Sequence, residues 1–151
     1  MKSRLPTLIA FTVALGGFHL PALQADNHGG DHGHSEIGEQ MEMIGKTFRS
    51  LRREARDPAN NAKSADLVGK MLAGAKASLG KTPSWTADQP ADKQAEFVAG
   101  YEKEMKVFVG LLTDLEKAFR ANDNDGAAAL IEKLRDQQRS SHKDYKKPDD
   151  D

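Results

Sequence analysis

The sequence predicts an all-α protein, an antiparallel up-down-up-down four-helix bundle. Four segments carry apolar residues at alternating steps of three and four, which places them on one side of a helix. No segment alternates apolar and polar residues with the period of two that a half-buried strand requires. Four amphipathic helices joined by fairly short connections bury their apolar stripes most simply in one shared core.

The first 25 residues are expected to be a signal peptide and not part of the fold. Lys2 and Arg4 give a positive start, residues 5–15 are apolar, and Ala25 provides a small residue before a polar stretch. The alternative is an uncleaved membrane anchor, which needs about 20 mostly apolar residues. Glycines, a histidine and a proline interrupt residues 16–23. Cleavage after Ala25 is favoured, and it predicts export to the periplasm with no membrane attachment afterwards.

The composition of the remaining 126 residues excludes several classes of protein. They carry 20 basic and 23 acidic residues, so no nucleic-acid partner is expected. The chain has no cysteine, which excludes disulfides, iron–sulfur clusters and thioether-linked cofactors. The fold must therefore be held by its core, by a non-covalent cofactor, or by both.

Two polar tails are expected around the bundle, which is assigned to residues 36–147. Residues 26–35, DNHGGDHGHS, have no large apolar side chain and predict a flexible His/Gly-rich tail, and residues 148–151 form an acidic one. If cleavage follows Ala25, the new amine and His28 at position three favour square-planar Cu(II) or Ni(II), with His32 and His34 as a second, looser site. The alternative is a plain polar linker.

The first two predicted helices have clear stripes and boundaries. The first begins after a Ser35 N-cap and stops at Pro58, and the second spans about 64–79. Their stripes are Ile37, Met41, Ile44, Phe48, Leu51 and Ala55, then Val68, Leu72, Ala75 and Leu79, with Leu67 and Met71 flanking the second. A loop with prolines at 83 and 90 contains the only tryptophan, Trp85.

The third helix is the longest, and the fourth departs from the bundle pattern. The third stripe is Val98, Tyr101, Met105, Phe108, Leu112, Leu115 and Phe119. Residues 122–126 predict a turn, followed by a fourth helix to about Tyr145 that uses Ala127, Ile131 and Leu134. Continuing this spacing gives Gln138, Ser141 and Tyr145, so the inward stripe becomes polar, with His142 on its flank. Fraying at the chain end is one explanation.

Antiparallel packing gives a second explanation. The start of the first helix and the end of the fourth lie at the same end of such a bundle, which brings Met41 and His142 near Leu79, Pro83, Trp85, Phe97, Tyr101 and Met105. A thioether and an imidazole are axial ligands of haem iron, and apolar walls bury the porphyrin. The alternatives are a methionine that fills the core and a histidine on the surface.

The chain resembles the cytochrome b562 family from Glu36 to Lys146. Glu132-Lys133-Leu134, with His142 and Tyr145 following, is similar to the family's last helix, and Met41 with Ile44, Phe48 and Leu51 is similar to its first. Lys70-Met71 with Thr82-Pro83, and Phe108-Val109-Gly110, stand at the family's distances. The resemblance implies a periplasmic carrier of single electrons with one non-covalent haem b, Met41 and His142 as iron ligands, and a protein redox partner.

Three departures from the family accompany the resemblance. Tyr101 and Met105 stand where family members have haem-contacting phenylalanines on the third helix. Gln138 replaces a common arginine one turn before the histidine, with Arg139 one step along. Extra residues lie between the first two helices and near the start of the third.

Three functions are therefore considered. Electron transfer by a haem in the bundle is favoured. The others are copper or nickel binding by the tail, and a haem-free bundle that binds a partner. An enzyme is not expected, because no carboxylate pair or phosphate-binding glycine loop is apparent. Ser140 and Ser141 lie beside His142, but neighbouring positions on a helix do not face each other.

Overall fold

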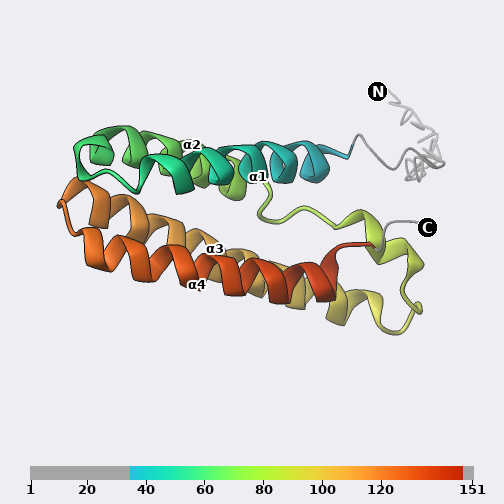
Figure 1. The fold of residues 1–151 in the computed structure, drawn as a ribbon. Coiled ribbons are helices and arrows are strands. Elements are labelled where there is room, and N and C mark those ends of the chain that lie inside the picture. The colour runs from blue at the N-terminus through green and yellow to red at the C-terminus, as the bar shows by residue number, and fades with distance from the viewer. Residues whose placement is uncertain (1–34, 148–151) are drawn as a thin grey trace, which may run out of the picture.

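The computed structural model describes residues 35–147, which form four α-helices in two adjacent pairs (Figure 1). The helices are α1 (Glu36–Glu54), α2 (Asn61–Ala77), α3 (Gln94–Arg120) and α4 (Asn124–Tyr145). Two short 3₁₀ helices, η1 (Pro58–Asn60) and η2 (Ser84–Asp88), lie in the connections. No strand occurs in these residues, so the predicted all-α four-helix fold is confirmed.

Each helix runs back along the one before it, and the close packing follows chain order: α1 on α2, α2 on α3, and α3 on α4. Within residues 35–147, α1 and α4 hardly approach each other. Two ion pairs show which ends meet: Lys81 after α2 binds Glu36 at the start of α1, and Lys147 Nζ after α4 lies 3.0 Å from Asp88 Oδ2 in η2. The start of α1 and the end of α4 therefore share one end of the bundle (Figure 1).

The helix ends follow the capping chemistry of the sequence, with some corrections. Ser35 is the expected N-cap of α1, since its Oγ accepts a 3.0 Å hydrogen bond from the Gly38 amide. Pro58 does not directly stop α1, which ends at Glu54; it opens η1, because proline suits the first position of a helical turn. α2 begins three residues earlier than expected and ends at Ala77.

α4 begins inside the segment expected to be a turn. Asp123 is its N-cap and accepts a 2.9 Å hydrogen bond from the Gly126 amide, so Asn124 already belongs to the first turn. The preceding Asn122 has φ 58°, the left-handed conformation that asparagine tolerates better than most residues. The actual reversal is therefore confined to residues 121–123.

The core lies at the centre of the bundle and towards the end that holds the α3–α4 turn. The expected stripes supply nearly all of it: Ile44, Phe48, Leu51, Val68, Leu72, Ala75, Tyr101, Met105, Leu112, Leu115, Phe119, Ala127 and Leu134 are buried. Met71, expected only to flank the second stripe, is fully enclosed. At the other end, Ile37, Met41, Val98 and Tyr145 are only half-buried. This end leaves room for a cavity.

No helix in residues 35–147 is both long enough and apolar enough to span a bilayer.

Candidate functional site

A cavity of about 700 Å³ opens at the end of the bundle where α1 starts and α4 ends. Residues of α1, α3 and α4 line most of it, and Met71 of α2 with Pro83 and Ser84 at the start of η2 complete the lining. Pockets that bind small molecules and cofactors measure about 300–1,000 Å³. The cavity exists because α1 and α4, the first and last helices, do not close against each other.

All five residues expected at the haem site line this one cavity. Met41 enters from α1 and is half-buried, while Tyr101 and Met105 come from α3 and are buried. Pro83 lies buried beside η2, and His142 comes from the last turn of α4, where its side chain is exposed at the rim. The antiparallel argument therefore placed these residues around one space.

Three residues expected nearby do not line the cavity. Leu79 is half-buried outside it, and Trp85 and Phe97 pack edge to face with ring centroids 5.8 Å apart. Phe97 also contacts Tyr145, with ring centroids 5.2 Å apart. These aromatic side chains pack η2 and the start of α3 against the end of α4.

The walls of the cavity are mainly apolar, and several of their apolar residues were not assigned to the haem site from the sequence. Ile37, Ile44, Phe48, Met71, Phe108 and Leu134 line the cavity. Each lies on an apolar helical position, and that position alone does not distinguish a cavity wall from ordinary core.

One buried polar atom in this wall has no partner. The Tyr101 side chain is 8% exposed, and its hydroxyl makes no hydrogen bond within residues 35–147. Burial raises the pKa of this phenol, so it stays protonated and remains a donor. Buried polar groups are nearly always hydrogen-bonded, so this hydroxyl is one of the exceptions within residues 35–147.

The histidine at the rim has an altered proton affinity. Desolvation by burial, and secondly the positive charge of Lys146, lower the pKa of His142 below its ordinary value. The neutral imidazole, which alone can coordinate a metal, is therefore favoured at neutral pH.

Charged and polar groups sit around the mouth. Arg49, Lys146 and Lys147 are cations in the lining, and Glu42 and Glu104 are carboxylates there. Glu104 and Gln137 were missed from the sequence. The available signal was a glutamate on the flank of the third apolar stripe, opposite the polar stripe of the fourth helix.

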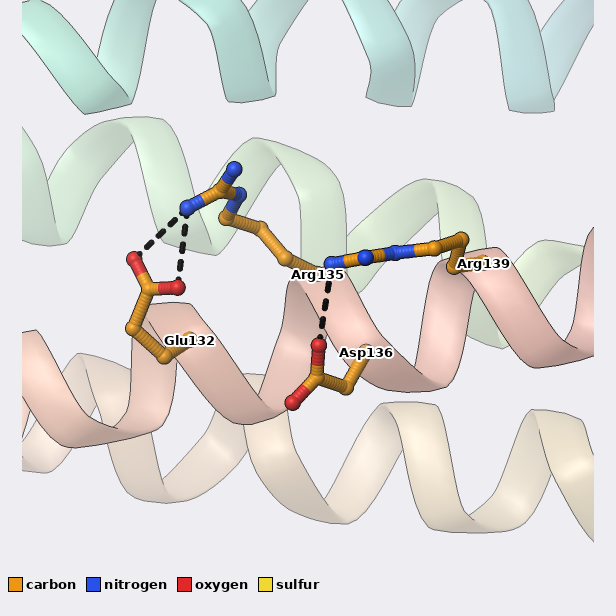
Figure 2. Close-up of polar contacts among 4 residues, drawn as sticks. All are labelled: Glu132, Arg135, Asp136 and Arg139. Carbon is orange, nitrogen blue, oxygen red and sulfur yellow. Dashed lines mark hydrogen bonds and ion pairs between the residues drawn. The ribbon is translucent and has the colours of Figure 1, made fainter.

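Gln138, which replaces the arginine common in the resembling family, lines the cavity, but Arg139 does not. Arg139 Nη2 binds Asp136 Oδ1 at 3.0 Å on the exposed side of α4. Figure 2 shows this pair beside the neighbouring pair of Arg135 and Glu132, whose Nη1 to Oε2 distance is 2.8 Å. Arg139 is therefore engaged outside and does not replace the missing arginine.

The comparison with protein families gives a match to the model described as cytochrome b562, over residues 36–146. The chain belongs to the cytochrome b562 family. The match covers all four helices of this cytochrome b562 relative and confirms the resemblance found from the sequence. Searches of curated proteins and of solved structures gave no match.

The expected copper or nickel ligands His28, His32 and His34 lie outside the described residues, as do the expected signal peptide and acidic tail. Within residues 35–147, no group of three His, Cys, Asp or Glu side chains could hold a metal ion. The site in the tail stays a prediction from the sequence.

Proposed function

We propose that this protein binds one haem b non-covalently in the cavity between α1 and α4 and carries single electrons in the periplasm. The supporting observation is that Met41 and His142, separated by 100 residues along the chain, line the same cavity. Membership of a family of haem-binding electron-transfer bundles agrees with it. Met41 and His142 are proposed as the two iron ligands.

The residues that line the cavity are chemically suited to a haem. Haem, when bound, supplies a one-electron iron couple, and methionine with histidine as ligands raises its reduction potential. The methionine sulfur and the neutral imidazole are suitable donors, and the lowered pKa of His142 keeps its nitrogen free of a proton. Apolar walls such as Ile44, Phe48 and Leu134 exclude water from the porphyrin face.

Polar side chains that line the cavity are suited to the carboxylate edge of a haem. Arg49 and Lys147 bring positive charge to the cavity, and carboxylates pair most strongly with such cations. Lys147 also binds Asp88 of η2 at 3.0 Å, which keeps its ammonium at the mouth.

Titration with haemin tests the proposal. The ligand-free protein, produced from Asp26 onward, should bind one equivalent and show a sharp Soret band, with split visible bands after reduction. A spectrum that stays that of free haemin at micromolar protein would overturn the proposal.

Periplasmic export is tested separately, through the N-terminus of the exported protein. Expression of residues 1–151 should yield a periplasmic protein whose intact mass corresponds to a chain starting at Asp26. A protein retained in the membrane fraction with its full mass would instead favour the uncleaved anchor.

A further inference from the structure

Between Leu134 and Tyr145, α4 has little hydrophobic anchorage. Ala127 and Leu134 are the buried residues of α4, and every later side chain of this helix is half-buried or exposed. α4 packs closely on α3 alone, because α1 stands across the cavity. Burial of apolar area is the usual source of helix anchorage, and between Leu134 and Tyr145 it is small.

Between Leu134 and Tyr145, hydrogen bonds connect α4 to α3. Gln137 Nε2 donates to the backbone oxygen of Glu104 at 3.1 Å and lies 3.2 Å from Ser141 Oγ. Ser141 Oγ donates to the Glu104 carboxylate, Oε2, at 3.3 Å. All three side chains are half-buried, and all three line the cavity.

The two α4 residues of this network lie on one face of the helix, which relates the network to the rotation of α4 about its own axis. Gln137 and Ser141 are four residues apart, so they lie on one face of the helix, one turn above the other. His142 follows Ser141 directly, about 100° further around the helix. With Ser141 held against Glu104, His142 is directed towards the rim of the cavity, where it lies.

We propose that Glu104, Gln137 and Ser141 form a polar clamp that fixes the end of α4 on α3 and so positions His142 before a ligand binds. The clamp thus explains one polar residue of the inward stripe, Ser141, since an apolar residue at position 137 or 141 could not make these bonds. The three are positioning residues, and the ligand role of His142 rests on the proposed function.

The first test needs no haem. Amide hydrogen exchange of the ligand-free protein should show residues 138–146 exchanging roughly 3- to 10-fold faster in Ser141→Ala and in Gln137→Ala than in the wild type, since each loses one or two modest hydrogen bonds. Ser140→Ala is the matched control, because Ser140 is exposed one position away. Equal exchange in Ser141→Ala and Ser140→Ala would overturn the clamp.

The second test reads the position of the imidazole. Ser141→Ala should bind haemin roughly 3- to 10-fold more weakly and show a larger high-spin fraction. This is the effect expected when the hydrogen bonds of the Ser141 hydroxyl are lost. Ser141→Thr, which keeps a hydroxyl at this place, should restore both. Affinity and spin state equal to those of Ser140→Ala would contradict the clamp. If the wild type itself binds no haemin, the proposed function fails, and the exchange experiment still decides on the clamp.

Discussion

The hydroxyl of Tyr145 on α4 lies where a Cβ would stand at position 100 of α3, so Gly100 is what allows this ring to reach α3. The ring lies between Phe97 and Tyr101, with centroid distances of 5.2 and 6.0 Å. Tyr145 is the last residue of α4, three positions after His142. Its contact with α3 and the polar clamp hold the same end of the same helix.

Replacing two glycines of α3 should have opposite effects on stability. Gly110→Ala should stabilise the ligand-free protein by about 1 kcal/mol, since Gly110 is exposed, no atom lies near its missing Cβ, and alanine is the better helix former. Gly100→Ala forces Tyr145 to move, at a cost of about 1–3 kcal/mol that cancels or exceeds this gain. Urea unfolding of both variants measures the difference. Equal stabilisation by both would show that Tyr145 does not depend on Gly100.

Removal of either proposed ligand should change the haem spectrum differently. Met41→Ala should keep haem but give a high-spin spectrum, because one axial position is lost while the imidazole remains. His142→Ala should weaken binding strongly. Met43→Ala is the matched control: Met43 is half-buried against Gly74 on the α2 side and does not line the cavity. Low-spin spectra in both ligand variants would show that the ligands are wrongly assigned.

Haemin affinity should fall in acid because of His142. Protons compete with iron for the imidazole, so binding is complete above the pKa of this residue and is lost as the pH falls through it. Burial, with a smaller effect of Lys146, lowers that pKa below its ordinary value of about 6.5. Affinity should thus be constant from pH 8 to about 6.5 and fall by up to about tenfold for each lower pH unit.

The matching measurement in the ligand-free protein is the NMR titration of histidine ring protons. The signal missing in His142→Gln belongs to His142, and its midpoint should lie below about pH 6.5. The folded state then binds this proton more weakly than the unfolded state, so His142 lowers stability as the pH falls, and only slightly because it is exposed. A midpoint above about pH 6.5 would contradict the position of His142 at the cavity near Lys146.

Arginine should improve haem retention at position 138 and contribute nothing at position 139. Gln138 lines the cavity, so Gln138→Arg adds a cation that can pair with a propionate, with a several-fold gain in haemin affinity expected. Arg139 is bound to Asp136 on the outer side of α4 (Figure 2), so Arg139→Ala should leave affinity unchanged. Dissociation of haem to excess apomyoglobin measures both. A loss of affinity in Arg139→Ala would mean that this side chain leaves Asp136 when haem binds.

The spacing of apolar residues predicted most of the fold, but it placed some helix boundaries inaccurately. Leu51, Leu112 and Leu134 are buried as their spacing requires, because three-four spacing fixes the side of a helix that a residue occupies. The helix boundaries were less accurate at Asn61 and Asn124. At Asn124, the Asp123 cap and the left-handed Asn122 decided where the helix begins, while at Asn61 α2 follows directly on η1.

The sequence by itself determined four helices, their inward sides and, through antiparallel order, the end of the bundle that Met41 and His142 share. The tertiary structure decided which neighbours surround them: Glu104 and Gln137 line the cavity, while Trp85 and Phe97 do not. The reason is physical. Spacing fixes direction around one helix, but the rotation and separation of two helices depend on every side chain between them, and no single stripe contains that information.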